Sequence, residues 1–227
     1  MTARIAVVAP VYGNAATLRP LAQRVAAALD GRNWRLRLVV DASPDDSAAV
    51  AGALAAEDPR IAVTVLDVNG GQHAALARGL ADEEAADAWV CLDADLQDPP
   101  EAVPLLLDRL AGADVAAVFA GRRGRYESAA RRLTGGLHRR VAARLTGLPP
   151  DAGAFFAMDR DVRDAVVRAV RDGGAPSVVL AVARARRPVT SISVERDRRP
   201  EGRSAWTART RLRQSLRSLT WAVRSGR

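Results

Sequence analysis

The chain has 227 residues, of which 48% are hydrophobic, so it is long enough to bury a sizeable core in one large domain. Its single cysteine, Cys91, excludes an internal disulfide and fits a reducing compartment. The formal net charge is +8 with no lysine among the basic residues, but aromatic residues make up only 4%, which argues against a nucleic-acid partner.

The chain shows no mark of secretion or of membrane insertion. Residues Met1–Arg4 lead directly into a short strand-like segment with a proline, unlike a secretory signal. No window offers the ~20 apolar residues of a membrane-spanning helix. We therefore expect a cytoplasmic protein, whose contact with a membrane would be peripheral, at the cytosolic face.

Short apolar runs rich in β-branched residues alternate with amphipathic segments of helical length. The pattern predicts strands at 5–9, 36–40, 61–66, 88–92 and 115–120, and helices at 15–29, 46–56, 71–82 and 101–110. Such alternation is typical of an α/β fold with parallel strands and crossover helices. Ligands of these sheets bind beyond the carboxyl ends of the strands, where three unusual peptides fall: Pro10–Tyr12, Asp41–Asp46 and the acids that follow residue 92.

The acidic peptide Asp93-Ala94-Asp95-Leu96-Gln97-Asp98-Pro99-Pro100-Glu101 is the most informative stretch. Alternate positions of an extended chain face the same way, so Asp93, Asp95 and Gln97 can offer three oxygens to one hard cation, which could hold a diphosphate. The alternative is that the acids cap the helix that begins near Pro99. Asp98 is expected to do that, which leaves Asp93 and Asp95 unexplained by capping. Cys91, in the preceding strand, is interpreted as a small buried hydrophobe.

The second half of the chain is rich in arginine. The segment 121–144 is predicted as a loop followed by a helix, and its arginines indicate either a solvated helical face or an anion-binding edge beside the metal site. Residues 151–158 and 189–194 are predicted strands, and 196–204 a polar loop.

The last segment, 205–227, is predicted as a basic amphipathic helix. Apolar residues recur in it at helical spacing, at Leu212, Leu216, Leu219 and Val223. The helix either packs on its own domain or lies in a bilayer interface with Trp206 and Trp221 near the headgroups. The sequence leaves both alternatives open.

Four motifs together resemble the inverting family 2 glycosyltransferases, over about residues 4–206: Val7–Tyr12, Val39–Ser47, Gly70–Leu76 and Asp93–Glu101. The acidic motif is highly specific for the dolichol-phosphate mannose synthase-like enzymes and their bacterial polyprenyl-phosphate relatives. The resemblance implies a GT-A type domain over 1–204, with a mostly parallel Rossmann-like sheet flanked by helices. Its nucleotide-sugar half would be 1–120 and its acceptor half 121–204, followed by the helix at 205–227. The implied reaction moves a sugar from a nucleotide diphosphate to a polyprenyl phosphate.

The resemblance also implies roles for individual residues. The implied ligands of Mg²⁺ or Mn²⁺ are Asp93, Asp95 and Gln97. The implied nucleotide-sugar-binding residues are Pro10, Tyr12, Asp41, Gly71, Asp93, Ala94, Arg199 and Ser204, the last two on a loop that closes over the diphosphate. The implied acceptor-phosphate ligands are Arg122, Arg125 and Arg131, and the catalytic candidates are Asp95, Asp151 and Arg122. Asp151 would orient the incoming group, and His73 would shape the nucleotide pocket or cap a helix.

Two positions depart from the family pattern. Val40 replaces one of two adjacent acids at the end of the second strand, and Phe156 stands where relatives often have an arginine. The protein would meet its lipid acceptor from the membrane surface or through a membrane-protein partner. Two alternatives remain: the same chemistry on a soluble small acceptor, or a non-catalytic module that binds nucleotides or polyanions.

Overall fold

The computed structural model describes residues 3–112, 114–123, 146–197 and 221. In chain order its elements are β1 (Arg4–Val11), α1 (Ala15–Ala28), β2 (Asn33–Asp41), α2 (Ser47–Glu57), β3 (Ile61–Leu66), α3 (Gln72–Asp82), β4 (Ala88–Cys91), η1 (Pro100–Ala102), α4 (Val103–Ala111), β5 (Ala117–Arg123), β6 (Phe156–Met158), α6 (Arg160–Arg171), α7 (Val178–Val182), η2 (Ala183–Ala185) and β7 (Val189–Glu195).

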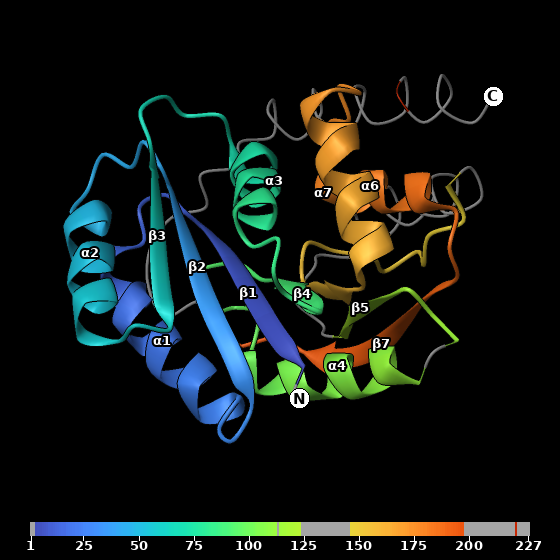
Figure 1. The fold of residues 1–227 in the computed structure, drawn as a ribbon, viewed down its shortest axis with the longest axis horizontal. Helices are drawn as coiled ribbons and strands as arrows, with labels where there is room; N and C mark the ends of the chain where they lie inside the picture. Colours follow the sequence, from blue (N-terminus) through green and yellow to red (C-terminus); the bar gives the residue numbers. More distant parts are fainter. Residues whose placement is uncertain (1–2, 113, 124–145, 198–220, 222–227) are drawn as a thin grey trace, which may run out of the picture.

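The described strands form one sheet in the order β3-β2-β1-β4-β6-β5-β7. Figure 1 labels each of these strands except β6. Strand β1 runs parallel to β2 and β4, β2 parallel to β3, and β5 parallel to β7, whereas β6 is antiparallel to both of its neighbours. The carboxyl ends of all these strands except β6 therefore lie along one edge of the sheet. The amino end of β6 lies at the same edge.

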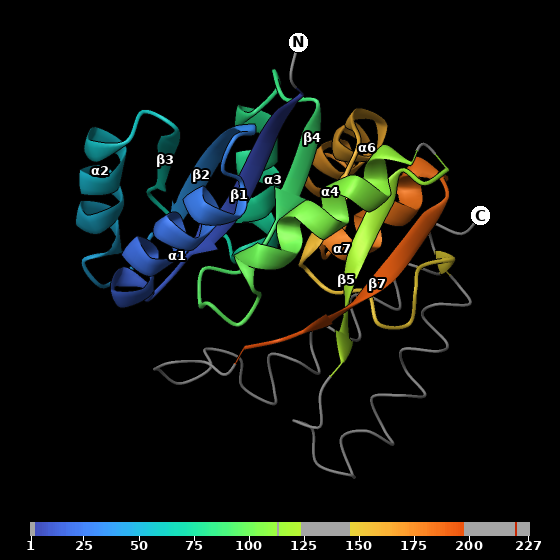
Figure 2. The same ribbon diagram turned by 90° about the horizontal axis from the view of Figure 1, so that it is seen from below.

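Helices cover both faces of the sheet (Figures 1 and 2). One apolar cluster joins the sheet to α1, α2 and α4, and a second joins it to α3, α6 and α7. Neighbouring residues of β1 belong to opposite clusters, with Val7 in the first and Val8 in the second. A strand buried on both faces has to be apolar at every position, which explains the continuous apolar run in the sequence.

This architecture confirms the predicted α/β fold with a mostly parallel sheet. The elements predicted over residues 5–120 are all present, with ends displaced by a few residues. Two predictions for the second half were wrong. The strand expected at 151–158 is confined to β6, and residues 121–123 continue β5 rather than starting a loop. The rest of the arginine-rich segment, 124–145, lies outside the described residues.

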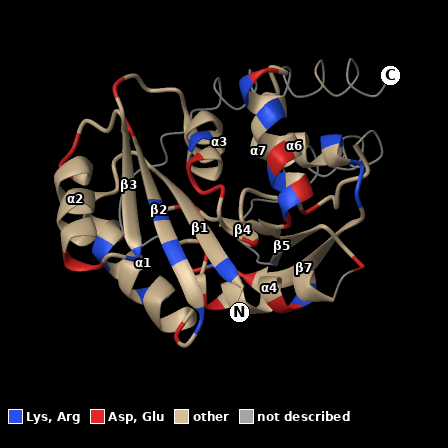
Figure 3. Ribbon diagram, in the orientation of Figure 1, with Lys and Arg blue, Asp and Glu red and all other residues tan. Residues whose placement is uncertain are grey.

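Helix α6 was not predicted. Its apolar residues, including Val162 and Val166, belong to the second cluster, while basic and acidic bands alternate along its ribbon (Figure 3). Asp159 caps its first turn by accepting a hydrogen bond from the Val162 N–H at 2.9 Å. This is the usual N-terminal signature of a helix.

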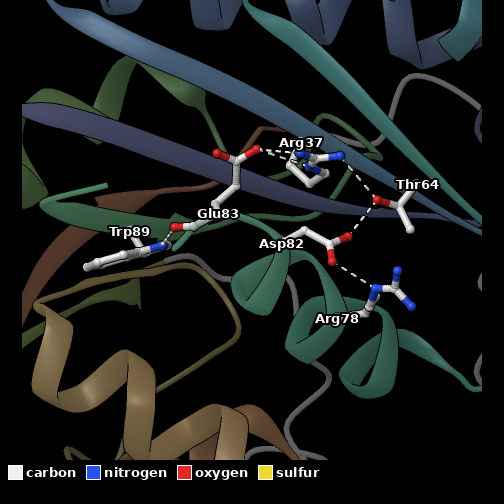
Figure 4. A network of polar contacts seen from close by, with 6 residues as sticks. All are labelled: Arg37, Thr64, Arg78, Asp82, Glu83 and Trp89. Carbon is white, nitrogen blue, oxygen red and sulfur yellow. Dashed lines mark hydrogen bonds and ion pairs between the residues drawn. The ribbon is translucent and has the colours of Figure 1, made fainter. Parts of the chain in front are cut away.

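A polar network fixes α3 against the sheet (Figure 4). The carboxylate of Glu83, only 3% exposed, accepts hydrogen bonds from Nε and Nη2 of Arg37 in β2, at 3.0 and 2.7 Å. The Thr64 hydroxyl of β3 donates to Asp82 at the end of α3, at 2.7 Å. The indole N–H of Trp89 donates to the Glu83 carbonyl at 2.8 Å, so the network also reaches β4.

Of the predicted C-terminal helix, the structure describes Trp221 alone, which is helical. The Trp221 indole N–H donates to the Gly173 carbonyl at 3.2 Å, and the ring packs against the second cluster. At this residue the contact is with the protein's own domain. In the part of the chain that the structure describes, no helix combines the length and apolarity needed to cross a bilayer.

Candidate functional site

The topology brings most of the predicted site to one edge of the sheet. Tyr12 follows β1, Asp41 ends β2 and Asp93 follows β4. Arg122 lies near the end of β5, and Asp151 precedes the antiparallel strand β6. These five positions come from five segments and meet at the edge where open α/β sheets bind ligands.

Asp41 organises the loop between β3 and α3. Its side chain is only 2% exposed, and its two carboxylate oxygens accept from the N–H groups of Gly70 and Gly71, both at 2.8 Å. Gly71 has a positive φ of 83°, a conformation that favours glycine. The predicted nucleotide residues Asp41 and Gly71 are therefore in direct contact.

The acidic motif forms a turn, not an extended strand. The chain leaves the sheet after Cys91, Leu96 has a positive φ of 61°, and Asp95 Oδ1 accepts from the Gln97 N–H at 3.0 Å. The expectation that alternate side chains face one way along extended chain was therefore wrong for this stretch. Asp93 and Asp95 still lie together in one turn at the carboxyl edge.

Asp98 binds an arginine and does not cap a helix. Neither η1 nor α4 has a side-chain cap, which corrects the role expected for Asp98. The buried carboxylate accepts from Nε and Nη2 of Arg196 at 2.7 and 2.6 Å. Nη2 of Arg196 also lies 3.9 Å from Asp93 Oδ2, while Gln72 donates to Asp93 Oδ1 at 2.5 Å. Arg196, directly after β7, thus fixes the acidic turn to the other half of the sheet.

The acidic turn fits a hard divalent cation by its donor chemistry. Within the described ranges, no three histidine, cysteine or acidic side chains form a metal cluster by themselves. Magnesium, however, usually binds through one or two carboxylates and completes its shell with water and substrate phosphate. Asp93 and Asp95 would supply those two carboxylates from one turn, and Asp98 is neutralised by Arg196.

Asp151 carries an oxygen in need of a donor. Its Oδ1 is buried and has no hydrogen-bond partner in the described structure, while Oδ2 accepts from the Ser191 hydroxyl of β7 at 3.3 Å. The carboxylate fills the space that a Cβ on Gly121 would occupy, since that Cβ would lie 2.8 Å from Asp151 Cγ. A buried carboxylate oxygen without a partner is costly, and nothing in the described structure offsets that cost at Oδ1.

Two other titratable side chains near the edge are unsuited to catalysis near neutral pH. Burial lowers the pKa of His73 to about 4, and its Nδ1 has no hydrogen-bond partner in the described structure. His73 makes no side-chain cap to α3, so that alternative was wrong. Burial, with a contribution from Asp93, raises the pKa of the Cys91 thiol, which stays a protonated, buried group as expected.

The structure describes some of the remaining predicted site residues and not others. Tyr12 is 47% exposed beside the half-buried Pro10, whereas the Ala94 side chain is buried and its carbonyl accepts from the Thr17 hydroxyl at 2.6 Å. Arg122 pairs with Val194 through the β5 and β7 backbones. Outside the described residues lie Arg125, Arg131, Arg199 and Ser204.

The two residues that depart from the family pattern, Val40 and Phe156, both lie in the core. Val40 is buried in the first cluster. Phe156 is fully buried in the second, where it stacks on Phe119 with ring centroids 5.0 Å apart. At position 156 the chain therefore has an apolar core residue rather than a side chain available to phosphate.

Several residues that contact the predicted site residues were missed from the sequence: Gln72, Arg196, Gly121 and Ser191. Their roles depend on contacts between distant segments, such as the pair Asp98 and Arg196, which are 98 positions apart.

Comparisons with known proteins agree with this geometry. Residues 6–166 match the model of the family described as Glycosyl transferase family 2. The chain is 37% identical over 169 residues to an undecaprenyl-phosphate 4-deoxy-4-formamido-L-arabinose transferase of Shewanella sediminis, covering 73% of this chain and 50% of the relative. It is 35% identical over 210 residues to the Pseudomonas fluorescens protein of the same name, covering 90% and 60%. The chain thus spans about half to three-fifths of these relatives' length.

Solved structures show the same fold at low identity. Glucosyl-3-phosphoglycerate synthase from Mycobacterium tuberculosis, in complex with Mn²⁺, uridine diphosphate and phosphoglyceric acid, superposes with a TM-score of 0.69 at 19% identity, covering 99% of this chain and 78% of that one. Mannosyl-3-phosphoglycerate synthase from Rubrobacter xylanophilus gives 0.67 at 17% identity, with 98% and 73% covered. The expected GT-A type of fold is confirmed.

Proposed function

Because the chain belongs to glycosyl transferase family 2, we propose that it transfers a sugar from a nucleotide diphosphate donor to a polyprenyl phosphate. The observation that best supports this is the meeting of the acidic turn and the unpartnered oxygen of Asp151 at one edge of the sheet. The undecaprenyl-phosphate transferases, which are the named relatives, support the lipid acceptor.

The first half of the chain would bind the donor. Tyr12 and Pro10 lie at the end of β1, and Asp41 and Gly71 lie beside the neighbouring loop, so the nucleotide would rest across the ends of β1 and β2. Asp93, Asp95 and Gln97 would hold Mg²⁺ or Mn²⁺, which stabilises the charge on the departing diphosphate. Ala94 would contribute backbone, and Arg199 and Ser204 would close over the diphosphate.

The second half, 121–204, would place the acceptor. Phosphate is already anionic near neutral pH, so its attack on the sugar depends on positioning more than on a general base. Arg122, Arg125 and Arg131 would bind its oxygens, because guanidinium groups match phosphate geometry. Asp151, whose Oδ1 has no hydrogen-bond partner in the described structure, would orient the incoming phosphate. Attack from the face opposite the departing diphosphate inverts the anomeric centre.

The proposed reaction would take place at a membrane surface. The acceptor is a lipid, so we place the reaction at the cytosolic membrane face, with residues 205–227 as a basic helix following the domain. The net charge of +8 favours an anionic surface. Flotation with anionic liposomes would test this placement.

The enzyme assay uses purified protein, a panel of nucleotide sugars, Mg²⁺ or Mn²⁺, and either polyprenyl phosphate or soluble phosphorylated acceptors. We expect a glycosylated lipid with one donor and no product after chelation of the metal. A product on a soluble acceptor alone would reassign the acceptor. Binding of nucleotide without any transfer, by folded protein, would contradict an enzymatic role.

A further inference from the structure

Hydrogen bonds tie the loop after β1 to the loop after β2, the adjacent strand of the sheet. Three consecutive backbone N–H groups, from this loop and the first residue of α1, donate to side chains of the second loop and the first residue of α2: Gly13 to Ser43 Oγ at 2.8 Å, Asn14 to Ser47 Oγ at 3.1 Å, and Ala15 to Asp45 Oδ2 at 3.0 Å. Gly13 has a positive φ of 70°, so the first loop makes a sharp turn. These contacts are tertiary, and they fix the residues that follow the exposed Tyr12.

All three contacts end at one carboxylate. The hydroxyls of Ser43 and Ser47 both donate to Asp45 Oδ1, at 2.6 and 2.5 Å. Each hydroxyl thus accepts from a backbone N–H and donates onward, and such chains strengthen each member by polarisation. The Ser47 N–H adds a further bond to Asp45 Oδ1 at 3.1 Å.

Helix capping alone does not explain this arrangement. A cap of α2 needs one acceptor for one or two N–H groups, which the bond from Ser47 supplies. It needs neither Ser43 nor Ala15, which belongs to α1. Asp46, the residue at the formal cap position, makes no side-chain capping bond. The additional bonds of Asp45 serve the loop after β1.

The electrostatics agree with an Asp45 carboxylate that stays charged. Burial raises the pKa of Asp45, but hydrogen bonds from Ser43, Ser47 and the backbone of Ala15 outweigh it and lower the pKa to about 2. The carboxylate therefore accepts these bonds at any pH at which the protein would work.

We propose that Asp45 is a positioning residue of the nucleotide subsite. Through Ser43 and Ser47 it holds the Tyr12–Asn14 loop in the conformation that receives the nucleotide, before the donor arrives. The inference rests on the proposed function, since it assumes that a nucleoside diphosphate binds at the end of β1. Preorganisation of this kind raises affinity by removing the cost of ordering the loop.

The test compares Asp45→Ala with Asp46→Ala, a neighbouring acid whose side chain makes no cap. Backbone hydrogen exchange is measured at residues 13–15 in donor-free protein, and the affinity for nucleoside diphosphates with Mn²⁺ by calorimetry. For Asp45→Ala we expect faster exchange at all three amides, and about tenfold weaker binding, as for a lost hydrogen-bonded contact to a charged group. In steady-state kinetics the donor KM rises and kcat stays close to wild type. Asp45→Asn, which keeps an acceptor oxygen, recovers part of the affinity.

The outcomes separate the two proposals. If backbone hydrogen exchange at residues 13–15 is unchanged in Asp45→Ala, Asp45 does not hold this loop. If exchange is faster but the affinity for nucleoside diphosphate is unchanged, the loop held by Asp45 has no part in nucleotide binding. A loss of nucleoside diphosphate affinity in Asp45→Ala that equals the loss in Asp46→Ala also counts against the inference. If wild-type protein binds no nucleoside diphosphate, the proposed function fails first, whatever the exchange shows, and this role for Asp45 fails with it.

Discussion

Gly121 leaves room for the carboxylate of Asp151. A Cβ at position 121 would overlap Asp151 Oδ2 and approach Cγ to 2.8 Å. The glycine is therefore required by a close approach between β5 and the residue that would orient the acceptor.

Replacing Gly121 by alanine should displace the Asp151 carboxylate. A displacement of about 1 Å can cost about 100-fold in rate. We therefore expect kcat to fall by up to about that factor while circular dichroism reports an intact fold. Gly52→Ala is the matched control, because a Cβ there meets nothing within 4 Å. Full activity of folded Gly121→Ala would contradict the role given to Asp151.

His73 should affect the acid stability of the protein. Its folded pKa is about 4, below the ordinary value of 6.5, because burial disfavours the charged ring. The unfolded chain thus takes up a proton that the folded chain does not as pH falls from 6.5 to about 4. The His73 contribution is complete above pH 6.5 and is lost through that window.

His73→Gln should therefore flatten the fall in unfolding free energy between pH 6.5 and 4, measured by urea titration. The neutral glutamine leaves the profile above pH 6.5 with the same shape. A profile identical to wild type across the whole range would show that His73 titrates normally in the folded protein.

At the residue scale, the sequence predicted which acids gather at the site but not what they contact. Spacing alone suggested Asp93 and Asp95, and the structure places them in one turn. The sequence could not reveal that Asp98 would pair with Arg196 instead of capping a helix, because that contact depends on the position of β7. Gly121 and Ser191 are informative only once β5 and β7 are seen to flank Asp151.

At the scale of elements, α3 depends on a buried ion pair with the sheet. The side chains of Arg37 and Glu83 are 14% and 3% exposed, and their nearest atoms are 2.7 Å apart. Removing one member of such a pair leaves the other charge buried without compensation.

Glu83→Gln should lower the free energy of unfolding by about 3 kcal/mol, measured by urea denaturation. The control is Glu57→Gln, which breaks the pair with Arg19 on the surface and should change stability little. Equal midpoints for the two variants would show that the Arg37–Glu83 pair does not stabilise the packing of α3.

Elements with strong periodicity were predictable, and those fixed by tertiary pairing were not. The run at residues 5–9 is apolar because both faces of that strand are buried, and the run at 36–40 is apolar except for Arg37, which pairs with Glu83. Strand β6 is only Phe156–Met158, and its antiparallel place between β4 and β5 is set by partners that the local sequence does not show. Helix α6 had readable signals in Asp159 and the arginines of its last turn, so this omission was avoidable.

Over the whole molecule, the topology explains why distant segments form one site. Parallel strands on both sides of β6 direct their carboxyl ends to one edge, and the reversed β6 delivers its preceding loop, with Asp151, to that same edge. On the proposed function, donor residues would come from the first half of the chain and acceptor residues from the second. The lipid acceptor and the membrane surface are proposals at this scale, which the sequence supports through resemblance and charge.

We propose that the turn after β4 holds a divalent cation that binds the donor's diphosphate. Calorimetry of nucleoside diphosphate binding, with Mn²⁺ and with a chelator, tests it most directly in wild type, Asp95→Asn and the control Asp108→Asn on α4. We predict metal-dependent binding by wild type and Asp108→Asn, and loss of that binding in folded Asp95→Asn. Equal affinity in Asp95→Asn, or binding that persists unchanged in the chelator, would contradict the account.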